Sequence, residues 1–138
     1  MRLEGLSKST PFYLNELDTR AVRSFAKTYW DASEASWVNY SDGYVVSFTR
    51  NGIVHRAYYT RSGALECTIL QYGEKDMPAD IRHMVKSAYY DYSIFLVNEV
   101  IKRGKTSYVI KIEDKTSIKE IEFDDDGMEV TKEFKKSK

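Results

Sequence analysis

The sequence contains one cysteine, two prolines and two histidines among its 138 residues. A single thiol, Cys67, cannot form an intramolecular disulfide or a Cys-x-x-Cys pair for zinc or redox chemistry, so stability must come from packing. No apolar run approaches the roughly 18 residues of a membrane span, and the first residues lack the apolar stretch of a signal peptide. We therefore expect either a cytosolic protein or the mature form of an exported one.

An excess of charge of either sign is also missing, since 21 basic and 21 acidic side chains cancel. Balanced charge gives no sign of a basic surface that would bind nucleic acid, and an apolar content of 42% argues against disorder. The length suits one domain, so residues 1–138 are predicted to form a single domain. The eleven tyrosines are the compositional outlier, and some of these rings are expected at the surface, where aromatic side chains often bind partners.

Two parts of the sequence resemble each other. An offset of 64 positions lays Tyr44–Phe48 onto Tyr108–Ile112, and it lays Gly63 onto Gly127. Such self-similarity predicts an internal repeat, with one copy over about residues 18–73 and the other over about 76–134.

Each copy is predicted to open with a helix. Apolar residues recur at i, i+3, i+4 and i+7, which is the stripe of a helix buried on one side. Asp18 and Asp76 are the candidate N-caps, and Pro78 suits the first turn of the second helix. The two stripes are Val22, Phe25, Ala26 and Tyr29, and Ile81, Met84, Val85 and Ala88. We expect Phe25 and Met84, in the middle of each stripe, to be core anchors.

Strands are predicted after each helix, because the apolar pattern changes to alternation. Short turns such as Arg50-Asn51-Gly52 favour antiparallel hairpins. The predicted fold class is α+β: a tandem repeat of a helix followed by antiparallel strands, in one continuous antiparallel sheet with two helices on one face and the other face open.

With these elements the chain resembles the PepSY-like family, exported proteins of Bacteroidetes that are similar to β-lactamase-inhibitor folds. The resemblance extends from about Asp18 to Phe134. The residues that carry it are Ala35–Trp37, Gly43–Phe48, Tyr59–Gly63, Met77–Pro78, Tyr108–Ile112 and Phe123–Gly127. It implies a non-catalytic module of the periplasm or cell surface. We predict no cofactor.

No catalytic constellation is recognisable in the sequence. His55 is predicted on a strand and His83 on a helix, where a lone histidine is more often structural than a general base. Cys67 alternates with Leu65 and Ile69, which favours a buried thiol. Phosphate-binding, metalloprotease and serine-hydrolase motifs are missing as well. We predict that the chain is not an enzyme, and an enzyme with an unrecognised site is the least favoured alternative.

The sharpest local signal is acidic. Glu122, Asp124, Asp126 and Glu133 follow the spacing of a calcium-binding loop, with glutamate in place of aspartate at the first position. The flanking alternation predicts strands rather than helices, and Asp126-Gly127 suits a hairpin turn. We therefore predict a turn without a metal, and a calcium-responsive structural domain of the cell envelope is the alternative function.

The preferred function follows from strand parity. If Tyr44 and Tyr59 face the helices, then Arg56 and Tyr58 face outward, with Trp37 or Tyr40 beside them. The candidate partner-binding residues are Trp37, Tyr40, Arg56 and Tyr58, because aromatic and arginine side chains are good anchors at protein interfaces. A second small core or a dimer contact is the alternative. The predicted function is an exported binding or inhibitor-like module whose open sheet face contacts another protein.

Overall fold

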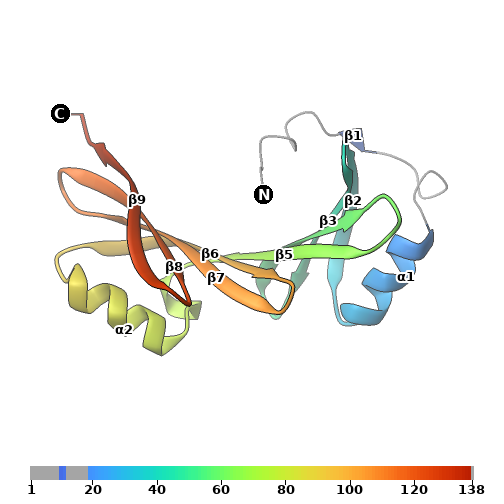
Figure 1. Ribbon diagram of the computed structural model, residues 1–138, viewed down its shortest axis with the longest axis horizontal. Coiled ribbons are helices and arrows are strands. Elements are labelled where there is room, and N and C mark those ends of the chain that lie inside the picture. The colour runs from blue at the N-terminus through green and yellow to red at the C-terminus, as the bar shows by residue number, and fades with distance from the viewer. Residues whose placement is uncertain (1–9, 12–18, 138) are drawn as a thin grey trace. The chain divides into compact units, whose positions relative to one another are not determined.

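The computed structural model describes residues 10–11 and 19–137, which Figure 1 traces along the chain. The chain divides into two compact units, Met1–Ile69 and Leu70–Lys138. Within each unit, strands that follow one another in the sequence are neighbours in the sheet. This order follows from the short loops, since a hairpin loop of a few residues can join only antiparallel strands.

The first unit is built from one helix and a set of antiparallel strands. Its elements are β1 (Thr10–Pro11), α1 (Thr19–Thr28), β2 (Ser33–Tyr40), β3 (Gly43–Arg50), β4 (Ile53–Thr60) and most of β5 (Leu65–Tyr72), the strand that leads into the second unit. In the register of β3 and β4, Tyr44 lies opposite Tyr59 and Val46 opposite Ala57. These pairs share one face of the sheet, because directly opposed residues point to the same side.

The second unit continues from β5 through a short helical turn. Its elements are η3 (Glu74–Asp76), α2 (Ala79–Ala88), β6 (Ser93–Lys102), β7 (Lys105–Glu113), β8 (Ser117–Asp124) and β9 (Gly127–Lys135). The central register lines up Val97, Ile110 and Ile121 from three successive strands, and all three are 0% exposed. These side chains form the middle of the core of this unit.

Two tight turns have a clear local cause. Asn51 and Gly52 join β3 to β4 with φ values of 53° and 76°, and Arg103 and Gly104 join β6 to β7 with the same values. A two-residue hairpin of this kind needs positive φ at both positions, which glycine adopts without strain and asparagine tolerates. Local sequence therefore determines these hairpins.

Each helix buries less of its predicted stripe than the periodicity suggests. In α1, Ala21 is fully buried, while Phe25 is partly buried against the core. In α2, Ile81 and Val85 are buried, whereas Met84 is 48% exposed, so its predicted role as a core anchor is wrong. A ten-residue helix lying flat on a sheet contacts it with a narrower stripe than a helix packed on both sides.

The predicted N-caps also differ from the structure. Asp76 belongs to η3, and α2 begins at Ala79, directly after Pro78, whose carbonyl accepts the N–H of Arg82 at 3.0 Å. Asp18 lies outside the described residues. Proline before the first helical residue thus marks the start of α2 without a side-chain cap.

The predicted fold class needs correction. Most of the described chain is antiparallel sheet, with two helices of ten residues each, so a tandem repeat of a helix followed by antiparallel strands, in one continuous sheet with two helices on one face, is not the right description. The broad α+β class still applies. The matches behind the repeat lie in hairpin turns and two-residue alternation, which any antiparallel sheet with strands of similar length shares. Burial differs as well, since β5 is largely buried and β9 largely exposed.

Neither α1 nor α2 is long and apolar enough to cross a membrane, and the same holds for every helix in the part of the chain that the structure describes.

Candidate functional site

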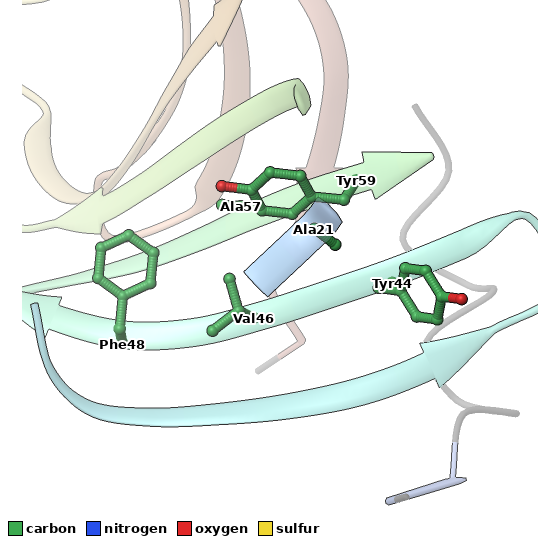
Figure 2. Close-up of a cluster of buried hydrophobic side chains, with 6 residues drawn as sticks. All are labelled: Ala21, Tyr44, Val46, Phe48, Ala57 and Tyr59. Atoms are coloured by element: carbon green, nitrogen blue, oxygen red, sulfur yellow. The ribbon is translucent and has the colours of Figure 1, made fainter. Parts of the chain in front are cut away.

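The face of the first unit that meets α1 is a closed core. Figure 2 shows six of its side chains, from α1, β3 and β4: Ala21, Tyr44, Val46, Phe48, Ala57 and Tyr59. Trp37 packs against this cluster, with its ring 5.5 Å from that of Phe25 and 5.7 Å from that of Tyr59. The structure therefore places Trp37 on the helix face, with the core side chains.

The opposite face of β2, β3 and β4 carries the other three predicted partner-binding residues. Tyr58 lies opposite Val45, and the two are 1% and 2% exposed. The ring of Tyr40 lies 6.1 Å from that of Tyr58, and Arg56 is half-buried opposite Ser47. Strand parity was thus predicted correctly for Tyr58, but burial removes it from the surface.

Tyr58 is an unusual buried tyrosine. Its hydroxyl makes no hydrogen bond to any residue that the structure describes, and burial raises its pKa to about 12, with Arg56 as a smaller opposing influence. A phenol that is out of contact with water and without an acceptor costs free energy rather than offering a binding handle. The four predicted residues consequently do not form one exposed surface.

Two of the three candidate catalytic residues, His55 and Cys67, are part of the packing. His55 is 5% exposed, its Nδ1 lies 2.8 Å from the carbonyl oxygen of Ile53, and its ring stacks on Phe48 at 5.0 Å. Cys67 is 2% exposed, as its alternation predicted. His83 lies on the exposed side of α2, in the other unit from His55.

The four acidic residues that match the calcium-loop spacing are not gathered at one point. Asp124 Oδ1 accepts the backbone N–H of Asp126 at 2.8 Å, which closes the turn between β8 and β9. Glu133 forms an ion pair with Lys119, far along β9 from this turn. Within residues 10–11 and 19–137, no three His, Cys, Asp or Glu side chains lie close enough to share a metal ion.

A shallow depression of about 580 Å³ lies at the other end of β7 and β8. Asp91, Ser93, Glu113, Asp114, Lys115, Thr116 and Lys136 line it. Lys136 Nζ donates to Glu113 Oε1 at 2.7 Å and to the carbonyl oxygen of Asp114 at 2.6 Å. Asp114 Oδ1 accepts the backbone N–H groups of Thr116 and Ser117, which lowers the pKa of this carboxyl. Much of the charge in this depression is thus already paired.

The face of the second unit that meets α2 is closed. The carboxylate of Asp80, in the first turn of α2, helps to raise the pKa of Tyr108, after burial and Glu99. Tyr108 lies two positions before Ile110 on β7, so the two share a face. Glu99 in turn accepts a hydrogen bond of 2.6 Å from the hydroxyl of Tyr72. Polar contacts therefore complete this core at the N-terminal end of α2.

The opposite face of β6 to β9 is the most open sheet surface in the described part of the second unit. Its residues follow from the register, because each is opposed to a neighbour on the same side. Four apolar side chains on it are half-buried, and Phe134 is 57% exposed. We call this surface the open face; its apolar members are Leu96, Val100, Val109, Ile118 and Phe134, and its charged members are Lys102, Lys105, Lys111, Glu113, Glu120, Glu122, Asp124, Glu129 and Lys132.

The charges in the middle of the open face are arranged in two different rows. Lys111 lies opposite Glu120, and Glu120 lies opposite Lys132 at an ion-pair distance of 4.0 Å, so signs alternate across three strands. In the next row Glu122 lies directly opposite Glu129, and neither forms an ion pair with a described residue. The spacing of the acidic run indicates only a metal-binding loop, whereas the opposition of Glu122 and Glu129 follows from a two-residue turn between β8 and β9.

Comparisons with solved structures show that other proteins share this fold. A BLIP-like protein of Bacteroides fragilis is similar with a TM-score of 0.70 at 14% identity, over 88% of this chain and 88% of that one. A DUF2874 family protein of Bacteroides ovatus reaches a TM-score of 0.70 at 16% identity, over 86% and 87%. A protein of Bacteroides eggerthii, described provisionally as periplasmic, reaches 0.66 at 18% identity, over 86% and 88%.

Sequence comparisons add nothing to these similarities: no protein-family model matches the chain, and no curated protein is similar to it. Identities below one fifth show a shared fold and leave the function open. The chain therefore has the fold of BLIP-like and DUF2874 family proteins of Bacteroides, while the resemblance to the PepSY-like family stays a prediction.

Proposed function

We propose that this chain is a non-catalytic, exported module that binds another protein through the open face of β6 to β9. The observation that carries the proposal is the composition of that face: apolar side chains from four adjacent strands stand half-exposed or exposed beside paired charges. Protein interfaces combine an apolar centre with charged residues around it in this manner. The proposal thus moves the predicted binding surface from β2–β4 to the second unit.

The burial pattern supports this choice of unit. On the first unit, Val45 and Tyr58 of the corresponding face are buried, so they offer little area to a partner. On the second unit, Val109 and Ile118 remain partly accessible, and Phe134 is exposed. When a partner covers apolar side chains that stand in water, binding is favoured by about 25 cal/mol for each Å² of apolar surface that is buried.

Export is part of the proposal. The similarity to a protein described provisionally as periplasmic supports it, and so does the resemblance to the exported PepSY-like family. The absence of any disulfide is compatible with this location, because packing alone stabilises the fold. Osmotic-shock fractionation of cells that make the protein tests this part: release with the periplasmic fraction is expected, and retention with the cytosol would contradict it.

Site-specific photo-crosslinking tests the surface. A photoreactive amino acid at Val109 and one at Ile118 should give the same crosslinked species in the native cell. The same amino acid at Ser87, which is exposed on α2, should not give this species. An excess of unlabelled wild-type protein should abolish the product, and an excess of the Val109→Asp variant should not. Equal crosslinking from Ser87, or equal competition by both proteins, would refute the proposed surface.

A further inference from the structure

The β8–β9 hairpin, which forms one side of the open face, carries carboxylates that form no ion pair with a described residue. Between positions 120 and 131 the sequence has six carboxylates and no basic residue, although the whole chain is neutral. These carboxylates are Glu120, Glu122, Asp124, Asp125, Asp126 and Glu129. In the described structure only Glu120 has an ion-pair partner, which is Lys132. The β8–β9 hairpin therefore ends in a region of negative potential.

Two of the carboxylates without an ion pair, Glu122 and Glu129, lie within the strands and away from the turn, so turn chemistry does not explain them. Glu122 and Glu129 are directly opposed on β8 and β9, at a spacing where like charges destabilise a sheet. On its other side Glu122 lies opposite Val109, one of the apolar members of the open face. A row of the uncovered sheet thus presents two repelling carboxylates beside an apolar side chain.

We infer that the partner of the open face is a protein segment with lysine or arginine side chains placed to pair with Glu122 and Glu129 and an apolar side chain on Val109. This inference rests on the proposed function and adds the chemistry of the partner. Such a segment would remove the repulsion between the two glutamates and cover the apolar side chain at the same time. Charge complementarity favours a basic protein over an acidic one, since like charge at an interface is penalised.

A divalent cation is the competing occupant of an acidic hairpin. The geometry argues against it, because the carboxylates alternate along two strands and no three of them converge among the described residues. A basic segment fits the same charges without convergence, since extended chains place side chains at the spacing of the strands.

Titration with model peptides, followed by amide chemical shifts, tests the inference. The probe is an end-capped peptide of alternating lysine and valine, and the controls replace lysine by glutamate or by glutamine. The lysine peptide should shift the amides of β7 to β9 around Val109, Glu122 and Glu129. The glutamate peptide should not. Binding should weaken severalfold in high salt, because exposed ion pairs are screened.

Charge-neutral variants supply the decisive comparison. In the double variant Glu122→Gln with Glu129→Gln, the dissociation constant for the lysine peptide should rise about fivefold, which is the size expected for two exposed pairs. Removal of the repulsion should leave this variant at least as stable as the wild type, so weaker binding cannot be blamed on unfolding. Glu34→Gln with Asp42→Asn is the matched control: it makes the same charge change at exposed positions of the first unit and should leave binding unchanged.

The outcomes separate the inference from the proposed function. If the glutamine peptide binds the open face as tightly as the lysine peptide, and the double variant binds as the wild type does, the face is a docking surface but its partner is not basic. The inference is also wrong if both double variants weaken the binding of the lysine peptide equally, or if none of the peptides shifts any amide signal. Calcium chloride alone is the last probe. Saturable shifts confined to the β8–β9 hairpin would mean that the occupant is a cation rather than a basic protein segment.

Discussion

Adjacent residues on β7 test the assignment of the two sheet faces. Ile110 is 0% exposed between Val97 and Ile121, whereas Val109 is half-buried on the open face. Truncation of Ile110 to alanine removes three carbon atoms, worth about 2.4 kcal/mol at about 0.8 kcal/mol each. The cavity left in a core that cannot fully collapse adds to this, so Ile110→Ala should cost about 3–4 kcal/mol. Val109→Ala should cost less than about 1 kcal/mol, because its surroundings are already partly solvated.

The choice of probe matters for this measurement. Both tryptophans, Trp30 and Trp37, lie in the first unit, so their fluorescence reports on that unit alone. Urea unfolding should therefore be followed by amide exchange in β7, which reports on the second unit, together with far-ultraviolet circular dichroism, which reports on the backbone of both units. A Val109→Ala cost as large as that of Ile110→Ala would mean that the open face is covered, and it would refute both the face assignment and the proposed binding surface.

Three further predictions concern stability. Tyr72→Phe should lower the unfolding free energy by about 1–2 kcal/mol in urea titrations, because the hydrogen bond to the half-buried Glu99 is lost; an unchanged midpoint would contradict this. In thermal melts, Gly43→Ala should cost about 3 kcal/mol or prevent folding, because a Cβ there would lie 2.0 Å from a backbone oxygen of β4. Gly73 has open space around it, so Gly73→Ala is the control and should leave the midpoint unchanged. Hydrogen bonds to the Asp114 carboxylate hold its pKa below the usual value near 4. The ionised carboxylate therefore stabilises the folded state at neutral pH, and this stabilisation is lost as the pH falls from about 4 through the lowered pKa. Asp114→Asn should flatten this part of the pH–stability curve, and an identical curve would refute the role of its charge.

Local chemistry explains why the hairpins could be predicted. Asn51-Gly52 and Asp126-Gly127 are recognisable as turns because positive φ is available to glycine at little cost, and alternation then places the strands between them. The same patterns appear in both halves of the chain, which suggested a tandem repeat that the structure does not bear out. Similar hairpins produce similar patterns whether or not the units that contain them are equivalent.

The candidate site could be predicted only in part. Parity correctly put Tyr58 on the face away from α1, and alternation correctly buried Cys67. Parity does not say what covers a face, so the burial of Tyr58 and the place of Trp37 in the helix-side core were missed. For the acidic run, spacing pointed to a metal loop, while the opposition of Glu122 and Glu129 needed the register of two strands.

The sequence by itself determined the order of the hairpins and the absence of intramolecular disulfide bonds, because the hairpins depend on neighbours within a few positions and the chain has one cysteine. Tertiary structure alone decided which sheet faces are closed. Met84 shows the difference: its place in an apolar stripe is a local property, but its 48% exposure depends on how α2 lies on strands that are distant in the sequence. Periodicity specifies which residues point the same way, and only long-range packing specifies whether anything lies there to meet them.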